Sequence, residues 1–212
     1  DVTYGNSPFT TSSNTIASAA YTGGDLNHKY HRQTIGVLKA IPSRVGAGPF
    51  GAELGGKKSE QYCLEDGGKK HTKEFEYQTY NPHQLLTSTD NFELGIALRM
   101  LGGEYGATTK RPRRIGLLDL PQLQFAAKMS GVDEIFITKI DELPRFNNSV
   151  YHGVPLVTAY HLNGKPLDTR PITTTELSQI TVIVGQNLNP ITDPITKNWK
   201  SLPSSVHKLV DI

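Results

Sequence analysis

Residues 106–114, with the sequence GATTKRPRR, combine hydroxyl groups and cations in a pattern that favours binding of an anion. The first residues expose backbone N–H groups and two threonine hydroxyls, and four cationic side chains follow. A guanidinium is a planar fork that matches the oxygens of a carboxylate or a phosphate, and free backbone N–H groups favour the same charge. The segment therefore predicts a site for a ligand with at least one carboxylate or phosphate. The alternatives are a solvated basic turn and a nuclear-localisation-like string.

A second candidate site is Thr138-Lys139-Ile140-Asp141, which ends the apolar run at residues 134–138. In many GTP-binding proteins an aspartate in such a position accepts hydrogen bonds from the guanine N1–H and 2-amino group. The lysine stem can lie along the face of the purine. The alternative is a surface ion pair, because Lys-x-Asp occurs often by chance.

Two further segments are candidates for ligand binding. Residues 10–14, TTSSN, form a hydroxyl run that either binds a phosphate or caps the helix that follows. Residues 43–50, SRVGAGPF, contain glycines that permit a close approach of backbone to ligand, and the alternative is a plain tight turn.

Several classes of function are disfavoured. The net charge of +2 is too small to indicate a nucleic acid or an acidic membrane surface as partner, and no apolar run approaches the ~20 residues that span a bilayer. The histidines show no metal-ligand spacing, and no Walker-type phosphate loop is present. The single cysteine, Cys63, cannot form an internal disulfide. We therefore expect a cytoplasmic protein, with neither a catalytic residue nor a metal ligand in this chain.

The elements that position these segments can be read from periodicity and caps. Asp90 is the expected N-cap of a helix over residues 92–101 that ends at Gly102 and Gly103. Asp119 is the expected N-cap of a second helix, which runs to Gly131.

Apart from residues 74–80, strands are expected in four segments. They are an apolar strand or helix end at residues 36–41, a buried strand at 134–138, a hairpin about Asn163-Gly164 and a strand at 181–184. Residues 55–89 are charged and read as a surface excursion, with an exposed strand or hairpin at 74–80. Single strands that alternate with helices favour an α/β class. The chain begins at Asp1 without a methionine, and residues 207–212 read as a helix without a stop signal. Both ends of the chain therefore look cut.

Taken in order, the segments DVTYGNSPFTTSSNT, VLKAIPSRVGAGPFGAEL, GGEYGATTKRPRRIGLLDL and ITKID form a series. The series resembles the adenylosuccinate synthetase family, whose members join aspartate to IMP at the expense of GTP. The resemblance covers residues 1–54 and 90–146 and, less distinctly, the remainder, and it indicates the C-terminal portion of such an enzyme. It implies a P-loop-NTPase-like α/β fold, with a central sheet flanked by helices, present here only in part.

The resemblance also implies a role for each matching residue. It assigns Thr11, Arg44, Val45, Gly46 and Arg111 to IMP; Thr108, Thr109, Arg111 and Arg113 to the aspartate carboxylates; and Lys139 and Asp141 to the guanine of GTP. In the family the aspartate side chain acts as base on IMP, GTP phosphorylates the IMP oxygen, and the aspartate amine displaces that phosphate. The phosphate loop, the catalytic aspartate and histidine, and the Mg²⁺ ligands belong to a part of the family sequence that has no counterpart here.

Three departures from the family pattern stand out. Lys110 occupies the place of a glycine, which adds a cation and removes backbone freedom. Gly51-Ala52-Glu53 replaces Pro-Thr-Glu, and residues 55–89 are an insertion that could be a lid, a partner surface or a tolerated loop.

The expected function is therefore that of a GTP-dependent ligase of purine biosynthesis. We treat residues 1–212 as one unit that grips IMP, L-aspartate and GTP but is inactive as an isolated chain. Mg²⁺ and a homodimer are expected of the full-length enzyme. The alternatives are a non-catalytic nucleotide-binding module and a family variant that acts on another purine nucleotide.

Overall fold

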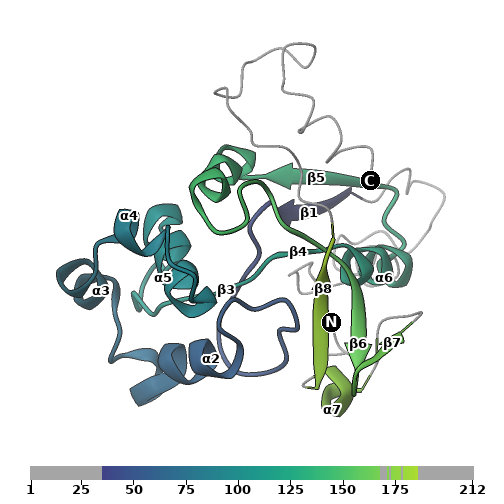
Figure 1. The fold of residues 1–212 in the computed structure, drawn as a ribbon, viewed down its shortest axis with the longest axis horizontal. Helices are drawn as coiled ribbons and strands as arrows, with labels where there is room; N and C mark the ends of the chain where they lie inside the picture. Colours follow the sequence, from purple (N-terminus) through teal and green to yellow (C-terminus); the bar gives the residue numbers. More distant parts are fainter. Residues whose placement is uncertain (1–34, 168–170, 172, 178, 186–212) are drawn as a thin grey trace, which may run out of the picture.

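The computed structural model describes residues 35–167, 171, 173–177 and 179–185. Helices α2 to α5 gather on one side of the molecule, the sheet of β4, β6, β7 and β8 lies on the other, and β1 with β5 lies beside both (Figure 1). The predictions for Thr11, for residues 10–14 and for a helix at 207–212 fall outside the described residues.

The described strands form three sheets of mixed direction. β1 (Ile35–Lys39) pairs in parallel with β5 (Glu134–Thr138), and β2 (Ser43–Arg44) pairs antiparallel with β3 (Arg114–Ile115). In the third sheet β6 (Leu156–Leu162) pairs in parallel with β4 (Leu118–Asp119) and antiparallel with β7 (Lys165–Leu167) and β8 (Ile180–Val184). The hairpin about Asn163-Gly164 and the strand near 181–184 are therefore confirmed.

The described helices include the two that the caps at Asp90 and Asp119 predict. They are α2 (Gly56–Leu64), η1 (Glu65–Gly68), α3 (Lys73–Thr79), α4 (Pro82–Leu85), α5 (Asn91–Gly102), α6 (Leu120–Ser130), η2 (Ile140–Asn148) and α7 (Thr174–Leu177). The Asp90 carboxylate accepts the Phe92 N–H at 2.8 Å, and α5 ends at Gly103 in the left-handed region. The Asp119 carboxylate accepts the Gln122 N–H at 3.0 Å, and α6 ends in the same way at Gly131. None of the described helices is long and apolar enough to cross a membrane.

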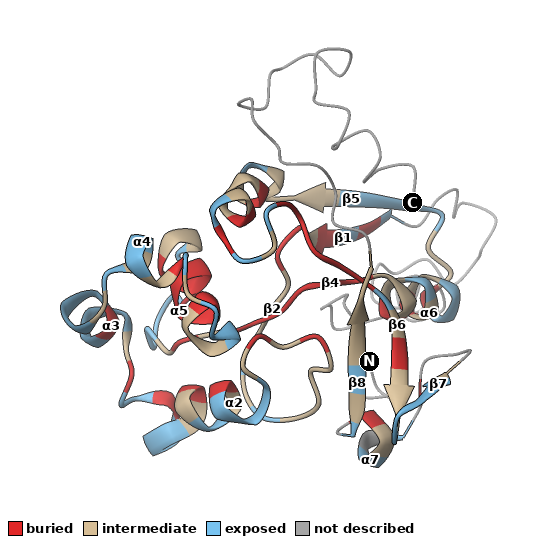
Figure 2. Ribbon diagram, viewed as in Figure 1, coloured by how far each residue is buried: buried red, intermediate tan, exposed pale blue. Residues whose placement is uncertain are grey.

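The hydrophobic core surrounds α5. Leu94 and Ala97 of this helix are fully buried, and they pack in one cluster with Leu38 of β1, Ile115 of β3 and Val157 of β6. Figure 2 shows α5 as the most buried helix of its group. The core therefore holds several strands in fixed positions relative to α5. The segment after α5 begins at the end of this fixed helix.

Two expectations about local structure are wrong. Residues 74–80 are not a strand: α3 covers most of them, capped by the Thr72 hydroxyl, which accepts the Phe75 N–H. Polar and aromatic residues alternate here, but the helix turns Glu76 inward, where its carboxylate is fully buried against the Arg99 guanidinium of α5. A buried ion pair thus overrides the period-2 pattern.

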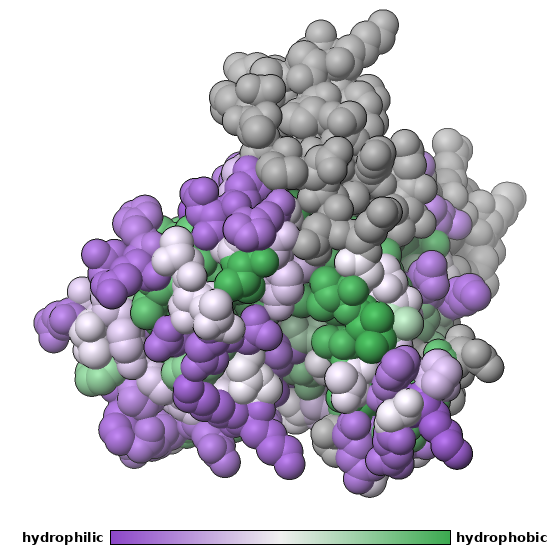
Figure 3. Space-filling model, in the orientation of Figure 1, coloured by the Kyte–Doolittle hydropathy of each residue, from purple (hydrophilic) through white to green (hydrophobic). Residues whose placement is uncertain are grey.

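The segment at residues 55–89 is also more than a surface excursion. Its outer face over α2 and α3 is hydrophilic (Figure 3), but Ser59, Cys63 and Leu86 are buried.

The second wrong expectation is the buried strand at 134–138, since β5 leaves Ile135 and Phe136 38% and 63% exposed. Among the described strands β5 has β1 as its one neighbour.

Candidate functional site

The loop at residues 106–114 is closed by its own backbone. Tyr105 and Pro112 form an antiparallel bridge, the Gly106 N–H donates to the Arg111 carbonyl at 2.9 Å, and the Lys110 N–H donates to the Gly106 carbonyl at 3.0 Å. The tip that contains Thr108 and Thr109 is exposed. The tip is thus accessible to a ligand, as an anion-binding loop requires.

The arginines of this loop divide into two kinds. Arg111 is half-buried, and within the described part of the chain its guanidinium has no hydrogen-bond or ion-pair partner, with Nε shielded from solvent. Arg114 is instead fully engaged: it forks onto the Glu53 carboxylate and donates to the carbonyls of Gly46 and Gly48 at 3.0 and 2.7 Å. Arg111 therefore has capacity for a ligand, whereas Arg114 is structural.

Glu104, immediately before the loop, gathers the cations of three segments. Its Oε2 accepts from Lys39 Nζ at 2.8 Å, from Arg113 Nη1 at 2.9 Å and from Ser43 Oγ at 2.8 Å, and its Oε1 accepts from Lys139 Nζ. The carboxylate is only 5% exposed, whereas the three cationic side chains are about a third exposed. One buried anion thus holds three cations that face partly outward, and the cluster carries two positive charges in excess.

The electrostatics of this cluster follow from the contacts. Burial alone raises the pKa of Glu104, but hydrogen bonds from Lys139, Lys39 and Ser43 outweigh it and bring the pKa to about 2. Burial lowers the pKa of Lys39 below its ordinary value, and the hydrogen bond to Glu104 offsets part of that effect. Glu104 is therefore ionised at neutral pH.

The parallel pairing of β1 and β5 explains how the lysines meet. Lys39 lies opposite Thr138 at the carboxyl ends of the two strands, and Lys139 follows directly, so both reach Glu104. The Lys139 Nζ also donates to the Gly102 carbonyl at 3.0 Å, and the Asp141 side chain is exposed at the start of η2. The structure thus brings Lys139 and Arg113, predicted for different ligands, onto one carboxylate.

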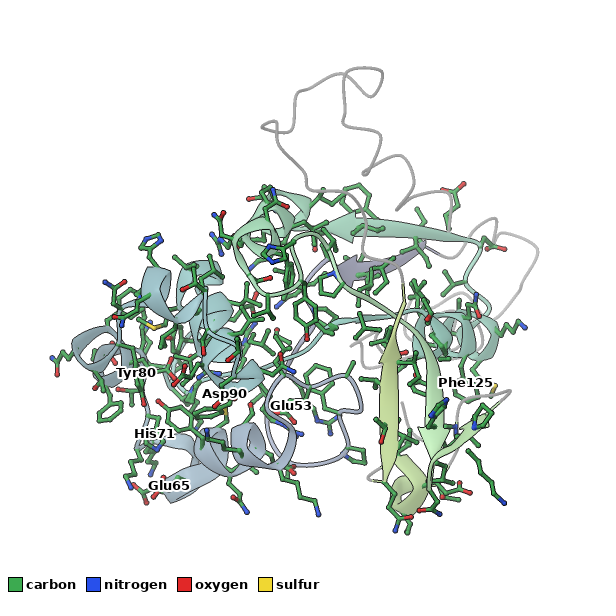
Figure 4. All side chains as sticks on the ribbon, in the orientation of Figure 1. Glu53, Glu65, His71, Tyr80, Asp90 and Phe125 are labelled. Carbon is green, nitrogen blue, oxygen red and sulfur yellow. The ribbon has the colours of Figure 1, made fainter. Side chains whose placement is uncertain are left out.

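The turn after β2 carries the other predicted residues. The Arg44 Nη2 donates to the Ala47 carbonyl at 2.8 Å, Val45 is 59% exposed, and Gly46 has a left-handed φ of 81°. Arg44 lies opposite Arg114 in the β2–β3 pair, so the turn lies next to the end of the loop. Figure 4 labels Glu53 beside this turn, where its carboxylate anchors Arg114.

Sequence reasoning assigned no role to Glu104 or Lys39, and it included Ser43 only as part of the candidate segment at residues 43–50. A signal was available for Lys39, because it ends an apolar run just as Lys139 does, and parallel strands bring such ends to one edge. For Glu104 the sequence offers only an acid two residues before a basic loop. Within the described residues no three His, Cys, Asp or Glu side chains are grouped to hold a metal ion, so no step is assigned to Mg²⁺ here.

Comparison with known proteins relates this sequence to one family. The family model for adenylosuccinate synthetase matches residues 1–212. The adenylosuccinate synthetase 2 of Cupriavidus pinatubonensis is 48% identical over 157 residues, which cover 74% of this chain and 35% of that protein. The adenylosuccinate synthetase of Thermoplasma acidophilum is 34% identical over 212 residues, which cover 99% of this chain and 39% of that protein.

A solved structure shares the fold. The structure of fully ligated adenylosuccinate synthetase from Plasmodium falciparum matches with a TM-score of 0.64 and 26% identity, over 94% of this chain and 38% of that one. The chain thus spans between 35% and 40% of the length of these relatives. From the match of the family model over all 212 residues, the chain belongs to the adenylosuccinate synthetase family, and its described part is a partial, mixed α/β version of that fold.

Proposed function

We propose that this chain is the substrate-gripping portion of a ligase that joins L-aspartate to IMP with GTP hydrolysis. The observation that carries the proposal is the meeting of the loop at residues 106–114 with Lys139 at the Glu104 carboxylate. The two segments would then hold aspartate and GTP in one site, as a reaction that consumes both together requires.

Each ligand has a set of residues whose chemistry suits it. The carboxylates of aspartate suit the guanidinium forks of Arg111 and Arg113, with the exposed hydroxyls of Thr108 and Thr109 beside them. IMP would lie along Arg44, Val45 and Gly46, with Arg111 reaching the ribose and Thr11 the phosphate. The exposed Asp141 would accept from the guanine of GTP, next to the stem of Lys139.

The proposal assigns grip and charge stabilisation to this chain, and not the chemical step. No Walker-type phosphate loop occurs in the sequence. The phosphate cradle, the catalytic aspartate and histidine, the Mg²⁺ site and the dimer are what the family leads us to expect of a full-length enzyme. In such an enzyme Mg²⁺ would neutralise phosphate charge during transfer from GTP. The three small sheets would be parts of its central sheet.

A chimaera tests the proposal. This chain replaces the matching segment of the Cupriavidus pinatubonensis synthetase, and adenylosuccinate formation from IMP, L-aspartate and GTP is measured. We expect activity, and we expect Arg113→Ala to lower kcat/KM for aspartate at least 100-fold because one carboxylate loses its partner. Lys128→Ala, on the last turn of α6, is the matched control.

Calorimetric titration of the isolated chain separates the alternatives. Binding of IMP, GTP or aspartate together with an inactive, folded chimaera would support a non-catalytic nucleotide-binding module. Activity with a different purine nucleotide would support the family variant. The proposed function is contradicted if the isolated chain binds none of the three ligands and the chimaera is also inactive.

A further inference from the structure

The helical segment at residues 56–85 contacts the candidate ligand-binding loop through its backbone. Lys73, the first residue of α3, donates its backbone N–H to the Lys110 carbonyl at 3.2 Å. Lys110 lies in the left-handed region with φ 54°, a conformation that costs a non-glycine residue roughly 1 kcal/mol. The bond from Lys73 therefore fixes the carbonyl of the residue whose backbone is most strained in the loop.

A buried network attaches both sides of the same loop to α3. The Glu76 carboxylate accepts from Arg99 Nε at 3.0 Å and from the Tyr105 hydroxyl, which precedes the loop. The Arg99 Nη1 donates in turn to the Arg113 carbonyl at 3.1 Å, at the other side of the loop. Glu76 and Arg99 are 0% and 1% exposed, so one buried ion pair connects α3, α5 and the two ends of the loop.

A third contact involves the arginine that has no described partner. A Cβ placed on Gly68 of η1 would lie 3.0 Å from the Arg111 Cδ and 3.1 Å from the Cys63 carbonyl oxygen. The Arg111 stem therefore packs directly against the backbone of the segment. Gly68 also has a φ of 81°, so the position requires glycine on two grounds.

We propose that the segment at residues 56–85 is a brace that holds the loop at 106–114 in its ligand-receiving shape, with Lys73 and Glu76 as positioning residues for Arg111 and Arg113. The identity of the ligand rests on the proposed function above, whereas the brace itself rests only on the contacts. The family pattern has a flexible glycine where this chain has Lys110, and the brace holds the Lys110 carbonyl in place. It is neither a lid nor a tolerated loop, because its attachments to the loop stem are buried.

The variant Lys73→Pro tests the brace by removing a single backbone N–H group. Proline removes the N–H but is well tolerated at the first position of a helix, and Thr72 before it already has an extended backbone with ψ 171°. Lys73→Ala is the matched control, because it keeps the N–H and removes the side chain. We expect Lys73→Pro to speed amide exchange at residues 106–113 at least ten-fold, and Lys73→Ala to leave it unchanged.

Equal exchange in the two variants and the native chain would overturn the brace. Tyr105→Phe is a second, milder variant, which removes the hydroxyl donated to Glu76 and keeps the ring. It should speed exchange in the same residues, and native exchange rates in this variant also count against the proposal.

Titration with L-aspartate in the presence of IMP and GTP separates the brace from the ligand assignment. We expect Lys73→Pro to raise the aspartate Kd about ten-fold and Lys73→Ala to leave it unchanged. If the native chain binds no aspartate and the chimaera is inactive, but Lys73→Pro still loosens the loop, the brace stands and the proposed function fails. If aspartate binds equally well to all three proteins, Lys73 is no positioning residue and the inference fails.

Discussion

The Glu104 carboxylate determines where the three cations of the candidate site lie. Lys39, Arg113 and Lys139 come from three segments, and without a shared counterion their like charges would repel. The carboxylate is buried and the cations are partly exposed, so the arrangement stores positive charge at the surface at a modest desolvation cost. An anionic substrate would meet cations whose positions are already set, which is the condition for effective charge stabilisation.

Glu104→Gln tests this role through stability. Glutamine is nearly isosteric but leaves three cations without a counterion, so we expect the free energy of unfolding at pH 7 to fall by about 2 kcal/mol. The measurement is urea denaturation followed by circular dichroism. Glu134→Gln, at an exposed position of β5, should change stability by less than about 0.5 kcal/mol.

The pKa of Glu104 predicts how the stability difference between the native chain and Glu104→Gln depends on pH. Because the folded pKa of Glu104 is about 2 and the ordinary value is 4.5, the carboxylate stabilises the fold above about pH 5. That contribution is lost as the pH falls through about 4.5 toward 2. The difference between native chain and Glu104→Gln should therefore shrink over this range, and a difference that stays constant from pH 7 to pH 3 would contradict the assignment.

Arg114 shows the opposite use of an arginine. It is 2% exposed, and its guanidinium donates four hydrogen bonds, two to the Glu53 carboxylate and two to carbonyls of the turn at residues 44–50. Lysine cannot reproduce this fork, so Arg114→Lys should lower the free energy of unfolding by about 3 kcal/mol. Arg113→Lys is the control, since its half-exposed single bond to Glu104 can be remade by an ammonium, and a loss of equal size there would refute the distinction.

At the scale of elements, the sequence predicted those structures whose causes are local. The caps at Asp90 and Asp119, the glycines at 103 and 131, and the Asn163-Gly164 turn each act within a few residues. They were therefore readable from the chain alone.

The errors have long-range causes. Residues 73–79 are helical although they alternate, because Arg99, 23 residues away from Glu76, supplies the buried partner. β5 is exposed because its neighbours among the described strands are few. The candidate site was predicted in its loop, its Lys139 and its glycine turn, whereas Glu104 and Ser43 became visible only when separate elements met.

The Glu76–Arg99 pair is what joins α3 to α5. Removing the charge of one partner leaves the other buried without compensation, so Glu76→Gln should lower the free energy of unfolding by about 3 kcal/mol. Glu74→Gln, on the exposed side of the same helix, should change it by no more than about 0.5 kcal/mol. Equal effects at the two positions would show that the pair adds nothing beyond helix propensity.

At the scale of the molecule, apolar packing divides into two clusters. The larger one unites β1, α5, β3, β4 and β6, with Leu54 and Leu86 at the borders of the helical segment. The smaller one contains Ile96, Met100 and Tyr105, packed against residues of the segment such as Tyr62 and Tyr80. The segment is thus attached mainly through the smaller cluster and the buried ion pair.

This division predicts an order of opening. Native-state amide exchange in low urea should show α2, α3 and the loop at residues 106–114 opening together, at a lower free energy than β1, α5 and β6. The loop should open with α3 because the Lys73 N–H and Arg99 connect them. In Glu76→Gln the opening free energies of the loop and α3 should fall by about 3 kcal/mol, and that of β6 should fall by the same amount through global unfolding, because both openings break the buried pair. A single opening free energy shared by the loop, α3 and β6 in the native chain would mean that the brace and the core unfold as one unit, and would contradict this order.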